Sequence, residues 1–291
     1  MISVRVPAST SNLGAGFDCL GLALDLWLEA RLTPGSGEPQ YSGAVADLAA
    51  ETDLIYEHLA ATGTTHDHQL CVHSDIPLGR GLGSSAAGRV ASLALDQIAR
   101  GLAIDKDDIF AASARLEGHP DNAGAAVYGG LILAAATPTH VTVHGEVGVA
   151  LAVPDRPVET EAARAMLPQH IDRHVVAAQA ARAAALVRGL EKGDPELIGY
   201  GMQDQLAVPY RKDLIPGFDA AVKAGRDAGG WGVTISGSGS TLVALSPKDV
   251  VSEVANAMAD ALTRNDNPAA PLTPAISATG LMTEGRTDGE K

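Results

Sequence analysis

A glycine-rich stretch that leads directly into a helical pattern carries the clearest chemical signal in the chain. Residues 77–87 read Pro-Leu-Gly-Arg-Gly-Leu-Gly-Ser-Ser-Ala-Ala. Glycines at alternate positions let the backbone take positive φ and approach a ligand closely, and Ser84 or Ser85 can serve as the N-cap of the helix that follows. Free backbone N–H groups and the positive end of the helix dipole together favour a bound phosphate. The stretch is neither a Walker A loop, which needs a lysine after its last glycine, nor a Rossmann fingerprint, whose glycine spacing differs.

Two further stretches carry polar side chains suited to a small charged molecule. Residues 7–18 read Pro-Ala-Ser-Thr-Ser-Asn-Leu-Gly-Ala-Gly-Phe-Asp, in which Asp18 can pair with an ammonium group and Asn12 can both donate and accept hydrogen bonds. Residues 117–122 read Glu-Gly-His-Pro-Asp-Asn. Glu117 ends a helical pattern, where the dipole does not favour an anion, so an acid there indicates a cation partner. Taken alone, each stretch is also compatible with an ordinary surface loop or helix end.

Two arginines in the second half are candidates for holding a carboxylate. Arg211 ends a Pro-Tyr-Arg triplet, and Arg164 stands in an alanine-rich helical stretch. The planar guanidinium offers two parallel donors that match the two oxygens of a carboxylate, although a single arginine is more often a solvated surface charge. Residues 232–241, Gly-Val-Thr-Ile-Ser-Gly-Ser-Gly-Ser-Thr, predict a strand followed by a second glycine-rich turn.

In this order, the stretches resemble the motifs of the GHMP kinases, a superfamily that includes galacto-, homoserine, mevalonate and phosphomevalonate kinases, and most resemble the homoserine-kinase family within it. The resemblance runs from Pro7 to Thr241 and covers most of the chain. It has two departures, because Ser240 stands where the family usually has proline and Val208 stands where a glutamate often precedes Pro-Tyr-Arg. No lysine occurs in residues 1–27, whereas other members often carry one there, paired with a catalytic aspartate, and this argues against the mevalonate kinases.

The resemblance implies that Mg²⁺ and ATP are used to phosphorylate the side-chain hydroxyl of L-homoserine, a step of threonine biosynthesis. The expected ATP-binding residues are Pro77, Leu78, Gly79, Arg80, Gly81, Leu82, Gly83, Ser84, Ser85, Ala86 and Ala87. The expected Mg²⁺ ligands are Ser85 and Glu117. The expected substrate-binding residues are Asn12, Asp18, His119, Asp121, Asn122, Arg164 and Arg211. Phosphoryl transfer depends on positioning and charge neutralisation, so we expect Asn122, Glu117 and Ser85 to be catalytic and no residue to be a dedicated general base.

Three alternatives stay open at the level of the sequence. The chain could be another GHMP kinase that acts on mevalonate or a sugar. It could also be a catalytically silent binding protein of the same fold. A non-enzymatic interaction protein would leave the glycine-rich stretch unexplained.

The elements that must position these residues mix strands and helices, which predicts the α+β class. Strands are expected at 2–6, 19–32, 69–73, 127–136, 141–153, 231–236 and 242–245, and helices at 47–62, 84–100, 105–116, 160–190 with a break at Pro168, and 214–228. The resemblance adds two domains, the N-terminal one like domain 2 of ribosomal protein S5 and the C-terminal one ferredoxin-like. We place them at 1–140 and 141–282, followed by a polar, frayed tail at 283–291.

Composition and charge exclude several classes of protein. The 291 residues are 46% hydrophobic and 19% charged, which predicts a globular protein. The net charge of −14 disfavours nucleic acid and anionic membranes as partners, so a site for ATP must create its positive field locally.

No apolar run is long enough to span a membrane, and no signal-peptide pattern is seen. Only Cys19 and Cys71 are present, so we expect a cytoplasmic protein. The oligomeric state stays open, a homodimer included.

Overall fold

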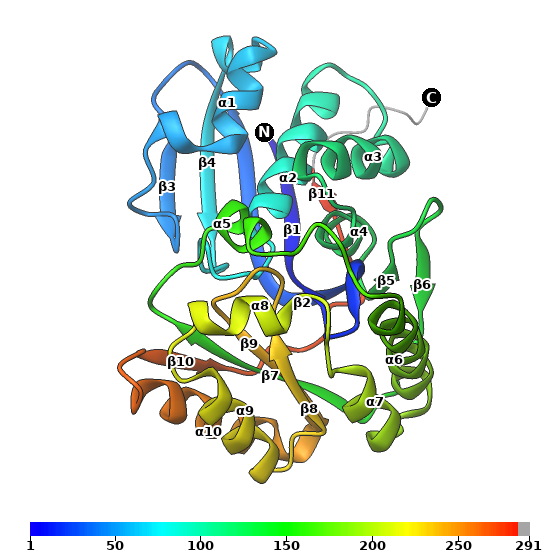
Figure 1. Cartoon of the computed structure of the whole chain (residues 1–291). Coiled ribbons are helices and arrows are strands. Elements are labelled where there is room, and N and C mark those ends of the chain that lie inside the picture. The colour runs from blue at the N-terminus through cyan, green and yellow to red at the C-terminus, as the bar shows by residue number, and fades with distance from the viewer. Residues whose placement is uncertain (285–291) are drawn as a thin grey trace.

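Two β-sheets form the framework of the molecule (Figure 1), a computed structural model that describes residues 1–284. The first sheet has seven strands in the order β11-β1-β2-β4-β3, with β5 paired to β2 and β6 to β5. Its strands are β1 (Ile2–Asn12), β2 (Gly16–Pro34), β3 (Gln40–Gly43), β4 (His68–Ser74), β5 (Leu131–Leu133), β6 (Thr139–Val141) and β11 (Met282–Glu284). The pairings are antiparallel except that of β3 with β4.

The second sheet has four antiparallel strands in the order β10-β7-β9-β8. Its strands are β7 (Val147–Pro154), β8 (Gly232–Ile235), β9 (Leu242–Pro247) and β10 (Ala269–Leu272). Helix α9 (Phe218–Asp227) and helix α10 (Val251–Thr263) pack on it and on each other. In Figure 1 they lie on the side of this sheet that faces away from the first sheet.

Strand β7 is buried on both faces, and its sequence shows why. Its odd-numbered residues, from Val147 to Val153, lie in a core shared with the first sheet. Ala150 and Ala152 lie in a second core beneath α10. Successive strand side chains point to opposite faces, so a strand with apolar neighbours on both sides reads as one continuous apolar run. The second sheet is therefore a middle layer that connects the two halves of the molecule.

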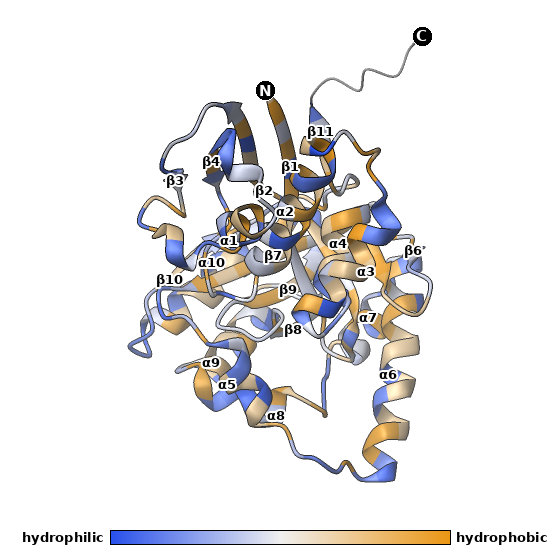
Figure 2. Ribbon diagram, turned by 90° about the horizontal axis from the view of Figure 1, so that it is seen from above, coloured by the Kyte–Doolittle hydropathy of each residue, from blue (hydrophilic) through white to orange (hydrophobic). Residues whose placement is uncertain are grey.

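Four helices cover the first sheet, and others border the space between the sheets. The covering helices are α1 (Leu54–Ala61), α2 (Ser84–Ala99), α3 (Lys106–Glu117) and α4 (Asp121–Tyr128). The others are α5 (Thr160–Ala165), α6 (Arg173–Lys192), α7 (Pro195–Gly201) and α8 (Val208–Arg211). Short 3-10 turns occur at Ala50–Thr52, Thr64–His66, Lys212–Leu214 and Lys248–Val250. Figure 2 shows α6 at the edge of the molecule. No helix within residues 1–284 is long and apolar enough to cross a membrane.

The predicted α+β class is confirmed, and some expectations about individual segments need correction. The sequence predicts a loop from Pro7, but β1 continues to Asn12, because the polar side chains near its end are buried and hydrogen-bonded. It also places Thr283 and Glu284 in a frayed tail, whereas these residues pair with β1. The rest of the predicted tail, 285–291, lies outside the described residues.

Candidate active site

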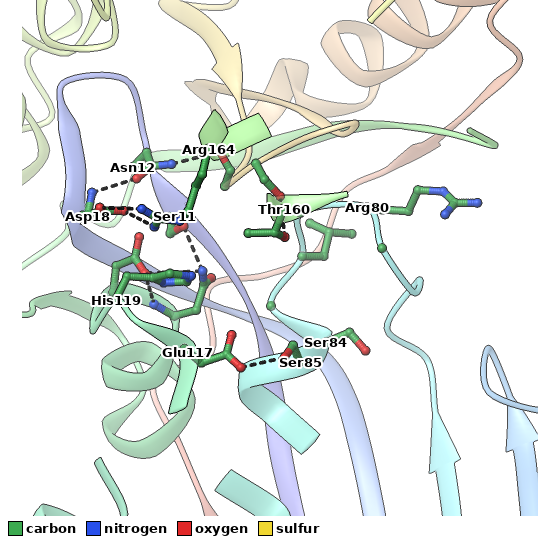
Figure 3. A pocket seen from close by; sticks show the side chains of 18 of the residues that line it. Ser11, Asn12, Asp18, Arg80, Ser84, Ser85, Glu117, His119, Thr160 and Arg164 are labelled. Atoms are coloured by element: carbon green, nitrogen blue, oxygen red, sulfur yellow. Dashed lines mark hydrogen bonds and ion pairs between the residues drawn. The ribbon is translucent and has the colours of Figure 1, made fainter. Parts of the chain in front are cut away.

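One cavity between the two sheets brings together side chains from six separate segments of the chain (Figure 3). From the predicted set, it is lined by Asn12, Asp18, Gly79, Arg80, Gly81, Leu82, Gly83, Ser84, Ser85, Glu117, His119, Asp121, Asn122, Arg164 and Arg211. The lining also includes Ser11, Thr160, Gly237 and Ser238, which were not predicted as site residues. Pro77, Leu78, Ala86 and Ala87 are not part of this lining.

The glycine-rich loop has the backbone that its sequence predicts. Gly79, Gly81 and Gly83 all have positive φ, at 64°, 73° and 71°. The N-cap of α2 is Gly83, which corrects the expectation that Ser84 or Ser85 fills this position; the two serines are the first residues of the helix. No side chain caps the helix, so its first N–H groups stay available to an anion such as phosphate.

The second glycine-rich turn, after β8, forms hydrogen bonds to the backbone of the glycine-rich loop. Ser236 Oγ donates to the Gly81 carbonyl at 2.6 Å, and the Thr241 N–H donates to the Arg80 carbonyl at 3.1 Å. The Arg80 guanidinium donates to the Pro154 carbonyl at 2.8 Å, and Figure 3 shows it pointing away from the other labelled side chains. Arg80 therefore ties the loop to the end of β7.

Buried side chains in the loop offer a ligand only their backbone atoms. Leu82, Ala86 and Ala87 are each 0% exposed. They fix the loop and the start of α2 against the core, so their predicted part in binding ATP is limited to backbone groups.

Glu117, at the end of α3, has the cation partner that its position predicts. Ser85 Oγ and Arg89 Nε each donate to Glu117 Oε1 at 2.6 Å. The Glu117 side chain is only 9% exposed. Arg89 was missed by the sequence reasoning, although it stands four residues after Ser85 on α2 and so on the same helix face.

Asp18 and Arg164 form a two-pronged ion pair across the cavity (Figure 3). Arg164 Nη2 and Nη1 lie 2.7 and 3.1 Å from the two carboxylate oxygens of Asp18, and the hydrogen bonds from Arg164 to Asp18 raise the pKa of Arg164. Asp18 is fixed by its own backbone, because its N–H donates to Asn12 Oδ1 at 2.9 Å. Asp18 and Asn12 both have positive φ, at 53° and 70°, a strained conformation that persists only where the surroundings enforce it.

Arg211 is a second cation at this end of the cavity, and it is almost fully buried at 3% exposure. Its Nε donates to the Ala163 carbonyl at 3.0 Å, and its guanidinium carbon lies 5.5 Å from the centre of the Phe17 ring. Burial and the neighbouring charge of Arg164 lower the pKa of Arg211. Among the described residues it forms no ion pair with a carboxylate.

The first turn of α4 presents a fixed amide, that of Asn122, next to an occupied carboxylate, that of Asp121. Asn122 Nδ2 donates to Ser11 Oγ at 3.0 Å, and Asn122 Oδ1 accepts from Ser9 Oγ at 2.8 Å. Asp121 Oδ1 lies 2.7 Å from His119 Nδ1. Burial lowers the pKa of His119, but the hydrogen bond and the charge of Asp121 outweigh this and raise the pKa above its ordinary value. Asp121 is therefore already engaged by the His119 imidazole.

A mostly apolar cavity adjoins the loop on the side of α1. It is lined by Leu28, Val45, Leu48, Thr52, Asp53, Leu54, Ile55, Val72, Leu78, Gly79, Ser84, Ser85 and Gly88. Gly79, Ser84 and Ser85 also line the first cavity, so the glycine-rich loop lies between the two.

Two family models match the chain. The family model described as "GHMP kinases N terminal domain" matches residues 44–130, and the one described as "GHMP kinases C terminal" matches residues 186–264. The chain belongs to the GHMP kinase family, which confirms the resemblance seen in its motifs.

Several relatives within this family that match most of the chain are named homoserine kinase. The chain is 39% identical to a homoserine kinase of Gloeobacter violaceus, over 88% of this chain and 91% of that protein. It is 35% identical to a homoserine kinase of a Nostoc species, over 98% of each chain. Among solved structures, the crystal structure of homoserine kinase from Cytophaga hutchinsonii superimposes with a TM-score of 0.83, at 28% identity and with 97% of each chain covered. A mevalonate kinase of L. major shares the fold at a TM-score of 0.66 and 17% identity.

Proposed function

We propose that this protein is a homoserine kinase, which transfers the γ-phosphoryl group of ATP to the side-chain hydroxyl of L-homoserine. The observation that carries the proposal is the Asp18–Arg164 ion pair, which faces the same cavity as the phosphate loop. An amino acid carries an ammonium group and a carboxylate, and this pair offers a partner of opposite charge to each. The relatives named homoserine kinase support the same substrate.

ATP would bind across the loop that separates the two cavities. The N–H groups at the start of α2 and the glycine backbone would hold its phosphates. The apolar cavity beside Leu54 and Ile55 would take the adenine ring, since cofactor pockets are lined mainly by apolar side chains. The phosphate chain would then point towards Asp18 and Arg164.

Ser85 and Glu117 fit Mg²⁺ as the metal of the site. Both offer hard oxygen donors, and among the described residues Glu117 Oε2 accepts no hydrogen bond, because Ser85 and Arg89 both use Oε1. No group of three or more His, Cys, Asp or Glu side chains in residues 1–284 could hold a metal ion, which suits an ion that takes one or two protein ligands together with phosphate oxygens and water. When bound, Mg²⁺ neutralises the charge of the phosphates.

Asn122 would orient the accepting hydroxyl, and no side chain would act as a dedicated base. The amide is held by Ser9 and Ser11, so its direction is set before the substrate arrives. Asp121 is paired with His119 and would support the turn. Positioning of this kind lowers the barrier because the reactants no longer have to find their orientation.

The substrate would replace the internal ion pair. Its ammonium group would take the place of the Arg164 guanidinium beside Asp18, and its carboxylate would bind the released Arg164 together with Arg211. We also propose that the chain divides into domains at 1–140 and 141–282. The cavity would then lie between them.

An ADP-release assay with Mg-ATP tests the proposal against L-homoserine, mevalonate, galactose and shikimate. Turnover on L-homoserine alone is expected, with a KM that rises in Asp18→Asn because the ammonium group loses its partner. Turnover on mevalonate or a sugar would overturn the substrate assignment and keep the phosphate site. Calorimetry with Mg-ATP identifies a silent binding protein, which would bind the nucleotide and turn over none of the acceptors.

A further inference from the structure

Arg89 contacts the active-site glutamate from outside the cavity. Its Nε lies 2.6 Å from Glu117 Oε1, the same oxygen that accepts the Ser85 hydroxyl. Ser85 and Glu117 line the cavity, whereas Arg89 does not. Arg89 is 26% exposed and Glu117 is 9% exposed, so the ion pair is partly shielded from water and from salt.

The contact with Arg89 determines which oxygen of Glu117 can bind a metal ion. Arg89 and Ser85 both use Oε1, which leaves Oε2 as the oxygen of Glu117 that can turn to a cation. A guanidinium at hydrogen-bonding distance also neutralises the carboxylate, and it repels a second cation that approaches the same group. The nucleotide phosphates supply the negative charge that offsets this repulsion.

We propose that Arg89 is a positioning residue that holds Glu117 through Oε1 and weakens its affinity for a free divalent ion, so that the ion binds together with the nucleotide. This inference rests on the proposed role of Glu117 as a metal ligand. It does not depend on which acceptor is phosphorylated. If Glu117 already bound a free Mg²⁺ ion, a nucleotide that arrives with its own Mg²⁺ would bind less readily. The free ion and the nucleotide-bound ion would compete for the same carboxylate.

Mn²⁺ serves as the probe, because the free ion is measured directly by electron paramagnetic resonance. The full-length protein is titrated with Mn²⁺ alone and with Mn²⁺ in the presence of ADP. For Arg89→Met we expect Mn²⁺ without nucleotide to bind about fivefold more tightly than in the wild type, which corresponds to about 1 kcal/mol, the size of effect expected for a partly shielded ion pair. In the presence of ADP the difference shrinks, since the phosphates already offset the guanidinium.

Two variants control for the charge itself. Arg89→Lys keeps the charge and should bind Mn²⁺ like the wild type. Arg115→Met removes one positive charge from the exposed last turn of α3, two residues from Glu117, and Arg115 forms no ion pair within the described part of the chain. It should leave Mn²⁺ binding unchanged. If Arg89→Met does not fold, as judged by thermal unfolding, Arg89→Gln replaces it, since it keeps an N–H donor without the charge.

A double-mutant cycle with Glu117→Gln shows whether Arg89 acts through the glutamate. In the Glu117→Gln background, Arg89→Met should no longer change Mn²⁺ binding. Unchanged or weaker Mn²⁺ binding in Arg89→Met alone overturns the proposal, and so does an effect that persists in the Glu117→Gln background. Failure to phosphorylate L-homoserine would overturn the proposed function and leave these Mn²⁺ results intact, so the two failures are distinguishable.

Discussion

Replacing Gly83 with alanine tests how closely the glycine-rich loop is packed against the amide of Asn122, which is predicted to be catalytic. A Cβ atom at Gly83 would lie 2.1 Å from Ser9 Oγ and 3.3 Å from Asn122 Oδ1. Ser9 Oγ is the donor that fixes Asn122. The substitution therefore pushes away the hydroxyl that orients the predicted catalytic amide, at the point where α2 begins.

The loss of folding stability in Gly83→Ala has a backbone part and a packing part. The two can be measured separately, because the chain contains a matched glycine. Gly101 follows the other end of α2 with the same φ of 71°, and a Cβ there would have no atom within 4 Å. Gly101→Ala should therefore cost only the left-handed backbone, about 1 kcal/mol. Gly83→Ala adds the displaced Ser9 hydroxyl and a less satisfied Asn122, at about 1 kcal/mol each, so its total is about 3 kcal/mol.

Thermal unfolding and steady-state kinetics measure both parts. At about 3 °C per kcal/mol, Gly83→Ala should lower Tm by about 9 °C and Gly101→Ala by about 3 °C. Misplacement of Asn122 should lower kcat about 100-fold in Gly83→Ala, with no change in Gly101→Ala. Adding Ser9→Ala to Gly83→Ala removes the closest clash and should recover part of the stability. Equal Tm values for the two glycine variants, with kcat unchanged in both, would refute this account of the loop.

Two further predictions concern the substrate end of the cavity, and a third concerns Cys19, the residue after Asp18. Arg211→Lys should raise the KM for L-homoserine about 30-fold and leave the KM for ATP unchanged, because a lysine cannot bind a carboxylate with two parallel hydrogen bonds; equal rises in steady-state assays would contradict this. Asp121→Asn should lower kcat less than tenfold, because Asp121 is paired with His119, and loss of turnover with homoserine binding intact would instead identify it as the base. Burial and nearby carboxylates raise the pKa of the Cys19 thiol above its ordinary 9.0, so less thiolate is present at neutral pH. Alkylation of Cys19 by iodoacetamide, followed in Cys71→Ser, should keep accelerating beyond pH 9, and a plateau below that pH would contradict the shift.

The backbone of the glycine-rich loop could be predicted from the sequence because its conformation is set locally. The positive φ of Gly79, Gly81 and Gly83 and the helix that starts after them are set by residues within a few positions of each other. Strand β7 was also recognisable, since an apolar run bounded by turns predicts a buried strand. Helix α4 was missed, because its eight residues contain Gly124 and no clear periodicity. Burial of α4, in which Gly124 approaches Ile132 closely, overrides the weak local preference.

The pairings inside the cavity could not be predicted, because they join residues that are far apart in the chain. Arg164 and Asp18 are 146 positions apart, and Ser9 and Asn122 are 113 positions apart. Residue types indicated that each could bind a charged or polar group, but not which partner it would meet. The role of Arg89 could not be predicted for the same reason. Its spacing from Ser85 lies within one helix, but its ion pair with Glu117 joins α2 to α3.

The charges of the cavity balance in pairs, and this explains how an acidic protein can bind two anionic groups. Asp18 pairs with Arg164, Glu117 with Arg89, and Asp121 with an imidazole whose pKa is raised. Arg80 and Arg211 are the exceptions among the charged residues that line the cavity, since the partners of both are backbone carbonyls. Arg80 points away from the other labelled side chains, so Arg211 supplies the uncompensated positive charge that would attract the substrate carboxylate before the Asp18–Arg164 pair opens. A zwitterionic amino acid that enters between Asp18 and Arg164 then adds no net charge to the cavity, so binding would be governed by fit.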